Sequence, residues 1–477
     1  MRSHSVSRRT GLLAVAALSG MLVACDNILK VSNPEQIPVT ALGDTTLLNA
    51  EVAGVVSEFQ DEYTRNNGAI LWSANFLTDE QVTGLNWEDY ARVNQRIVNY
   101  TEGPVASLWG GLSSIIRLGE DVSARIETLL GPQDKRIALT SALTGYGYTL
   151  TGEHMCMAVF GTAENPGTTL ETPAQIFQRA IPWFQRAISV GSATGQANLV
   201  NLAHAGLARA YLSLGDFPNV IQEASAVPAG FRYWVEYSAA QTSENNGLYG
   251  NVHGANFNMG VSPWFLQGTF GDLNIITTQT DPRIQHAKDW KKGHNALTPL
   301  YKPYQGLRFS GYTGQTQAPP SASCPNCTGA VASSSGDTGP LLLYQQDTKV
   351  LLADYLEAQH DLMEATLRSG GSEAAVLDFV NQRRAVGNEA PVQLTGSDLF
   401  AELRRQRSRD FYQGGLRLGD LRRWKRDGVG DFFPSGNHVN REWGAYSNWT
   451  CYPLPLSEYE GNPALPKPAD PFTPPGI

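Results

Sequence analysis

The chain has 477 residues, of which 42% are hydrophobic and 17% charged, and its formal net charge at pH 7 is −9. The low charged fraction excludes a chain kept disordered by charge repulsion, and the apolar fraction is sufficient for a large core. An acidic chain without a block of basic residues is a poor candidate for nucleic-acid binding, so we expect no nucleic-acid partner.

The N-terminus is typical of an export signal followed by a lipid attachment site. Three arginines precede an apolar run from Gly11 to Ala24. The run is shorter than the about 20 residues of a transmembrane helix, so we interpret residues 1–24 as a cleaved signal peptide. Residues 22–25 read LVAC, which is similar to a bacterial lipobox, and Cys25 is therefore the predicted lipidation site. The alternative is an ordinary signal peptide with an incidental cysteine.

Helical periodicity dominates residues 46–227, which follow a predicted lipidated tether at residues 25–45. Apolar side chains recur at helical spacing over residues 105–130, and residues 135–160 are rich in small residues and tyrosine. Residues 173–227 resemble a tetratricopeptide pair, with a proline at a helix start and small side chains in the second helix. One repeat cannot bury its own apolar face, so we expect further hairpins to stack on it.

The middle of the chain, residues 228–345, differs from both flanks. Glycine, asparagine, proline and aromatic residues dominate it, so we predict an irregular, ligand-facing insert of long loops and short strands. Cys324 and Cys327 form a CxxC motif in this region. Zinc is a weak interpretation without nearby histidines, and a local disulfide is expected in an oxidising exterior. A bridge between Cys156 and Cys451 is possible, but the sequence leaves it open.

Helices return after residue 348. Glycine pairs separate them, and a serine can cap the second and the third. The three predicted helices cover residues 350–368, 373–386 and 398–413, with Ser372 and Ser397 as the capping residues.

Several segments of this last third carry a family resemblance. They read LADYLEA at residues 352–358, VNQRR at 380–384, RDF at 409–411, GLRLGDLRRW at 415–424 and YPLP at 452–455. In this order, and after the lipobox and the repeat-like helices, they resemble the SusD/RagB family of outer-membrane nutrient-binding lipoproteins. The resemblance covers most of the chain except the loop-rich middle.

The resemblance implies a mainly α fold of stacked, tetratricopeptide-like hairpins. Residues 46–477 would form a single domain, with its helical scaffold at about 46–227 and 346–425. The resemblance further implies a receptor without enzymatic activity or cofactors, attached by its lipid to the outer membrane and facing the exterior. It would bind nutrient ligands, with oligosaccharides the expected class, and deliver them to a TonB-dependent barrel of the SusC type.

Three residues depart from the family pattern. Gln406 and Gly414 stand where glutamate is usual, and Asp410 replaces a longer glutamate, so we expect a weaker ion-pair network. Arg417 and Asp420 remain in place. A guanidinium beside a carboxylate can clamp a ligand, but the resemblance implies a scaffold role for this segment. We therefore expect a structural ion-pair corner.

Sugar rings stack their C–H faces on tryptophan or tyrosine and hydrogen-bond to amide, carboxylate and guanidinium groups. Two stretches of the sequence combine such residues. In the SusD/RagB family, which this chain resembles, ligand is contacted by loops at one end of the scaffold, which favours both stretches. The alternative for each aromatic side chain is core packing. The candidate ligand contacts are Trp72, Asn75, Asp79, Trp87, Tyr90, Trp264, Trp290 and Tyr304.

Two other functions stay open. A glycoside hydrolase needs two carboxylates about 5–10 Å apart across a cleft. Asp79-Glu80 and Glu88-Asp89 supply carboxylates, but adjacent acidic pairs are common on solvated faces, and no G-x-S-x-G motif marks a serine hydrolase. We therefore expect no enzyme. The second alternative is a peptide-binding receptor of the same architecture.

Overall fold

The chain forms two compact units, residues 1–48 and 49–477. In the first unit, Asp44 caps the 3-10 turn η2 (Thr45–Leu47). The remaining elements lie in the second unit, except that α2 (Leu48–Thr64) begins at Leu48, the last residue of the first unit. The computed structural model describes residues 42–65, 68–162, 165–252, 258–262, 265, 281–284, 291–292, 299–300, 303–310, 312, 330–332, 338–340, 344–438 and 443–466.

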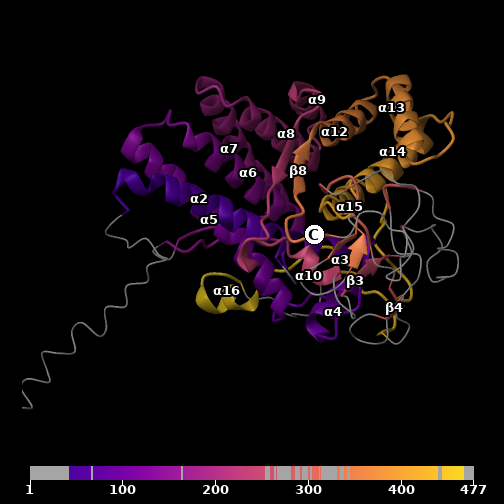
Figure 1. The fold of residues 1–477 in the computed structure, drawn as a ribbon, viewed down its shortest axis with the longest axis horizontal. Coiled ribbons are helices and arrows are strands. Elements are labelled where there is room, and N and C mark those ends of the chain that lie inside the picture. The colour runs from indigo at the N-terminus through magenta and orange to yellow at the C-terminus, as the bar shows by residue number, and fades with distance from the viewer. Residues whose placement is uncertain are drawn as a thin grey trace, which may run out of the picture. The chain divides into compact units, whose positions relative to one another are not determined.

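Helices make up most of the described chain, which confirms the mainly α fold expected from the sequence (Figure 1). The helices are α2 (Leu48–Thr64), α3 (Ile70–Leu77), α4 (Glu88–Asn94), α5 (Gly103–Leu130), α6 (Arg136–His154), α7 (Pro173–Ala193), α8 (Ala197–Leu214), α9 (Phe217–Ala226), α10 (Leu248–Val252), α12 (Tyr355–Arg368), α13 (Glu373–Val386), α14 (Gly396–Asp410), α15 (Arg417–Arg426) and α16 (Leu456–Gly461), with a 3-10 turn η3 (Thr242–Glu244).

The strands are short and pair antiparallel in twos. They are β1 (Gln81–Thr83) with β3 (Met259–Val261), β2 (Arg232–Val235) with β8 (Val350–Asp354), β4 (Lys291–Lys292) with β5 (Pro299–Leu300), and β6 (Ala330–Ala332) with β7 (Thr338–Pro340). Most of these strands lie in residues 228–345, where the sequence predicts an irregular insert with short strands. Among the described residues, no helix combines the length and the apolar character needed to cross a membrane.

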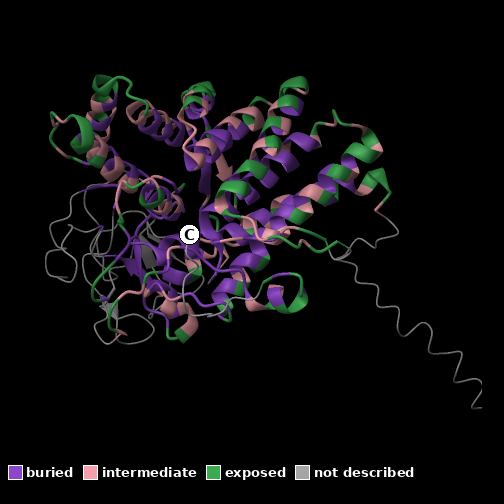
Figure 2. Ribbon diagram, turned by 180° about the vertical axis from the view of Figure 1, so that it is seen from behind, coloured by how far each residue is buried: buried purple, intermediate pink, exposed green. Residues whose placement is uncertain are grey.

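Consecutive helices stack on one another as expected for helical hairpins. α6 packs between α5 and α7, α8 packs on α7, and α9 joins α8 to α12 (Figure 1). Figure 2 shows buried residues gathered where these helices face each other and exposed residues at their outer ends. The predicted tetratricopeptide pair is therefore part of a longer stack, which buries the apolar face of each hairpin.

Glycines let three of these helices approach closely around one ring. Phe184 of α7 is fully buried. A Cβ atom on Gly206 of α8 would lie 2.4 Å from this ring, and one on Gly145 of α6 would lie 2.7 Å from it. Both distances are far below van der Waals contact, so the ring fits only because both positions lack a side chain.

The boundaries of three predicted helices differ from the sequence prediction. Residues 350–354 form strand β8 rather than helix, because this apolar run is buried and pairs with β2. Helix α6 ends at His154, before residue 160, because Cys156 N–H donates to the carbonyl oxygen of Tyr452. Helix α14 begins before Ser397, which therefore lies inside its first turn and is not the cap.

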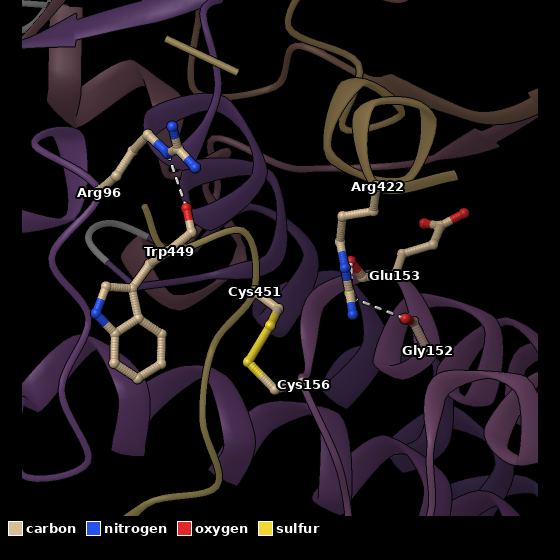
Figure 3. The surroundings of a disulfide bond; sticks show 7 residues. All are labelled: Arg96, Gly152, Glu153, Cys156, Arg422, Trp449 and Cys451. Atoms are coloured by element: carbon tan, nitrogen blue, oxygen red, sulfur yellow. Dashed lines mark hydrogen bonds between the residues drawn. A yellow bond between two sulfur atoms is a disulfide. The ribbon is translucent and has the colours of Figure 1, made fainter. Parts of the chain in front are cut away.

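A disulfide joins Cys156, just after α6, to Cys451 near the C-terminal end of the chain (Figure 3). The same region is held by guanidinium groups that donate to backbone carbonyl oxygens. Arg96 donates to Trp449 at 2.8 Å, and Arg422 donates to Gly152 at 3.0 Å (Figure 3). The C-terminal segment around residues 449–451 is thus fastened to the ends of α4 and α6, and α15 is fastened to α6, by side chains distant in sequence.

Replacing Gly206 by alanine should lower the free energy of unfolding by roughly 1–3 kcal/mol, because the added methyl group overpacks the Phe184 site. Urea unfolding measures this loss. Gly110→Ala is the matched control, since a Cβ atom there meets nothing within 4 Å. It should leave stability unchanged or raise it by up to about 1 kcal/mol. Equal stability of the two variants would contradict the packing described for α6, α7 and α8.

Candidate functional site

An aromatic ladder of three rings, Trp87, Tyr90 and Trp72, runs from the surface into the core at the start of α4. Trp87 is its outermost member and is 54% exposed. The ring centroid of Trp87 lies 5.6 Å from that of Tyr90, which lies 5.6 Å from that of Trp72. Both contacts are edge-to-face, a favoured arrangement of aromatic rings. Trp87 is therefore a surface ring that rests on a ring supported by the core.

Asn94 fixes the position of α4. Its side-chain amide nitrogen donates to the carbonyl oxygens of Phe76 at 2.9 Å and Gln81 at 2.8 Å, and its oxygen accepts from Thr83 N–H at 3.1 Å. These partners come from α3 and β1. A buried amide with all these bonds made is costly to move, so the helix that begins after Trp87 has a defined place on the core.

Trp72 and Asn75 are core residues, which corrects the sequence prediction that they contact ligand. They lie on α3, whose residues are all buried, and they are 1% and 0% exposed. A helix with apolar side chains around most of its circumference belongs in the core. Trp72 supports the ring of Tyr90, and the amide of Asn75 donates to the carbonyl oxygen of Gln413 at 3.5 Å.

Asp79 also leaves the predicted ligand surface, because it is only 7% exposed and has a structural partner. Its two carboxylate oxygens accept from Nε and Nη2 of Arg417 at 2.8 and 2.7 Å. Asp420, three residues from Arg417, instead accepts from Arg407 and Arg423 at 2.8 and 2.9 Å. The buried ion-pair corner expected here is thus present, but the partner of Arg417 comes from a distant segment.

The shorter carboxylate at position 410 is fully engaged in this network. Asp410 accepts from His360 at 2.7 Å, from Arg383 at 2.7 and 2.8 Å, and from Arg283 at 3.0 Å. Burial raises the pKa of Asp410, but the hydrogen bonds from His360 and Arg383 outweigh it and hold that pKa well below its ordinary value. The carboxylate is therefore charged and compensated.

The other two departures from the family pattern also fit this network. The side-chain oxygen of Gln406 accepts from Arg283 at 2.8 Å, and its amide nitrogen donates to Glu389 and Glu402. A Cβ atom on Gly414 would lie 2.6 Å from Cγ of Arg308. Gly414 therefore makes room for Arg308, and Gln406 connects buried charges without adding another one.

Glu80 is fully buried beside this corner. One carboxyl oxygen accepts from Gln413 N–H at 3.0 Å, and the other has no partner among the residues that the structure describes. Burial raises the pKa of Glu80 well above its ordinary value, and this outweighs the opposing effects of Gln413 and Arg417. With Asp79 bound to Arg417 and Glu80 in the core, this acidic pair does not face a solvent-exposed cleft.

The remaining predicted site residues divide into two groups. Tyr304 is only 2% exposed, so the prediction that it contacts ligand is corrected to core packing. Burial raises its pKa. Five further residues lie outside the described parts of the chain, and their roles stay predictions. These residues are the proposed ligand contacts Trp264 and Trp290, the lipidation site Cys25, and the CxxC cysteines Cys324 and Cys327.

A polar cavity of about 340 Å³, which no sequence pattern indicated, lies beside α2. Two of its carboxylates already form ion pairs, Asp61 with Arg65 and Glu236 with Lys349. Within the described parts of the chain, no three His, Cys, Asp or Glu residues are grouped as a metal site requires. The cavity is lined by Ser57, Gln60, Asp61, Glu236, Tyr237, Ser238, Ser243, Glu244 and Asn245.

The structural role of Asp79 leads to a stability prediction. Asp79→Asn should lower the free energy of unfolding by about 3–5 kcal/mol, because it leaves the guanidinium of Arg417 buried without a charged partner. Glu88→Gln is the control, since Glu88 is exposed and lies 3.6 Å from Arg92. It should change stability by less than about 1 kcal/mol. Urea unfolding measures both variants, and an Asp79→Asn protein as stable as the control would refute the structural role.

The fold of this chain is similar to those of solved structures. No protein-family model matches the sequence, and no curated protein matches it. Solved structures do match. A SusD superfamily protein from Bacteroides vulgatus is 14% identical, with a TM-score of 0.59 over 89% of this chain and 98% of the other. A SusD-like protein from Bacteroides fragilis is 14% identical, with a TM-score of 0.62 over 90% and 98% of the two chains.

A SusD-like carbohydrate-binding protein from Bacteroides fragilis is 13% identical, with a TM-score of 0.62 over 89% of this chain and all of the other, 100%. The resemblance seen in the sequence is confirmed at the level of the fold: this chain has the fold of the SusD superfamily.

Proposed function

We propose that the protein is an outer-membrane lipoprotein that binds glycans and delivers them to a TonB-dependent transporter of the SusC type. The observation that carries glycan binding is the exposed ring of Trp87, held at the surface by the aromatic ladder. Structural neighbours include a SusD-like carbohydrate-binding protein, which supports the ligand class. The transporter partner and the location follow from the sequence resemblance alone.

The chemistry of the Trp87 surface suits a sugar ring. An indole offers a large, rigid apolar face on which the C–H face of a pyranose can stack. Beside it, the side chain of Glu88 is 83% exposed and can accept hydrogen bonds from hydroxyl groups. This surface offers one principal ring and few polar contacts. Affinity for a single sugar unit should therefore be weak, because the entropy lost on association offsets much of the contact energy.

The membrane attachment in this proposal depends on the N-terminal segment. Residues 1–24 would be removed, and Cys25 would carry the acyl chains that hold the protein to the outer membrane through a tether at residues 25–45. Residues 46–477 would then form the ligand-binding domain. Mass spectrometry of the protein purified from membranes tests this part, because loss of residues 1–24 and acylation of Cys25 give a defined mass.

Glycan binding is tested by Trp87→Ala. On a glycan array and in titration of the best ligand, the variant should lose at least about tenfold in affinity, or about 1.4 kcal/mol. Trp183→Ala is the matched control, because Trp183 is a half-buried tryptophan on α7, away from the ladder. Unchanged affinity in Trp87→Ala would reject the surface. Binding of peptides but no glycan would favour the peptide receptor, and cleavage of a glycan would favour a hydrolase.

A further inference from the structure

An arginine on α14 lies among three aromatic rings. The guanidinium carbon of Arg404 is 4.3 Å from the ring centroid of Phe432, 5.2 Å from that of Phe400 and 5.4 Å from that of Trp424. Such distances give favourable cation–π contacts. Phe432 is 37% exposed and Arg404 is half-buried. The guanidinium therefore sits at the surface, on a base of aromatic side chains.

Arg404 differs from the other guanidinium groups around Trp424. Arg417 and Arg423 also face this ring, at 5.7 and 5.5 Å, but both bind a buried carboxylate, Asp79 and Glu364 respectively. In the part of the chain that the structure describes, Arg404 has no carboxylate within ion-pair distance, and its buried Nε–H has no acceptor.

The guanidinium of Arg404 is thus partly removed from water, and a bound anion could neutralise its charge. Burial lowers the pKa of Arg404 below its ordinary value, despite the opposing effect of Glu364. A partly buried charge without a partner is unfavourable, and an incoming carboxylate would relieve that cost.

The ring beside the guanidinium indicates what carries the anion. A planar guanidinium pairs with a carboxylate through two parallel hydrogen bonds. Phe432 has the guanidinium over its ring and is 37% exposed, so it offers apolar surface next to that fork, which suits the C–H face of a sugar. We propose that Arg404 and Phe432 bind the carboxylate and ring of a uronic acid unit in an acidic glycan. The inference rests on the proposed function for its ligand class but uses α14 and α15, not α4.

The test is titration of the full chain with glucuronate, monitored by ligand-observed NMR, with glucose as the neutral analogue. We expect glucuronate to bind and glucose to bind at least about tenfold more weakly. Arg404→Gln should reduce glucuronate affinity to the level of glucose. Arg404→Lys keeps the charge and the contact with the rings but not the planar fork, so it should fall between wild type and Arg404→Gln and report on ligand binding even if Arg404→Gln is unstable.

Arg186→Gln is the matched control. Arg186 lies 5.9 Å above the ring of Trp183 and already pairs with Glu127, so this variant should bind glucuronate like wild type. Equal binding of glucuronate and glucose, or wild-type affinity in both Arg404 variants, would overturn the proposal. Acetate that binds as tightly as glucuronate would overturn the role of the sugar ring.

The same experiment separates this site from the Trp87 surface. Trp87→Ala should weaken the binding of neutral oligosaccharides but preserve the loss of glucuronate affinity that Arg404→Gln causes, since Arg404 and Phe432 remain. Failure of every neutral oligosaccharide to bind would count against the proposed function, whereas failure of glucuronate to bind at Arg404 would count against this inference alone.

Discussion

Buried guanidinium–carboxylate pairs join segments of this chain that are far apart in sequence. Arg209 of α8 binds Glu153 of α6 through two hydrogen bonds of 2.7 Å and lies 3.4 Å from Glu357 of α12. Arg407 of α14 connects Asp361 of α12 to Asp420 of α15, at 2.7 and 2.8 Å. A buried ion without its partner costs several kcal/mol, so these helices must assemble in a single arrangement to satisfy each charge.

Both candidate ligand surfaces depend on this network. Arg417 of α15 binds Asp79 in the turn between α3 and β1, and α3 and β1 are the elements to which Asn94 fastens α4 and Trp87. Trp424 of the same helix donates its indole N–H to Glu364 at 3.1 Å and presents its ring to Arg404. The ion-pair corner around Arg417 and Asp420 therefore does not bind ligand itself. It positions other side chains that face solvent.

Local signals predicted the helices well and the pairings between distant segments poorly. The helix over residues 373–386 appears with its predicted bounds, because Ser372 accepts from Ala375 N–H as a cap should. Residues 350–354 form a strand because they pair with β2. Strand β2 lies more than a hundred residues earlier in the sequence, so no local pattern predicts this pairing. The same holds for Arg417, whose partner Asp79 is 338 residues away, although Asp420 is three residues away.

The candidate site shows the same limit. The sequence identified the residue types for a sugar surface but not which of them face solvent. For Trp72 a signal was present, because α3 reads ILWSANFL and is apolar on nearly every side. Trp87 precedes Glu88 and Asp89, which suit the first turn of a helix. Arg404 could not be identified from sequence, because its significance lies in having no carboxylate partner among the described residues, while its neighbours have theirs.

A crystal structure of the protein with a bound oligosaccharide tests the central claim most directly. The account predicts a pyranose ring stacked on the indole of Trp87, with the Asp79–Arg417 pair intact. A sugar bound elsewhere, with Trp87 free of contact, would contradict it.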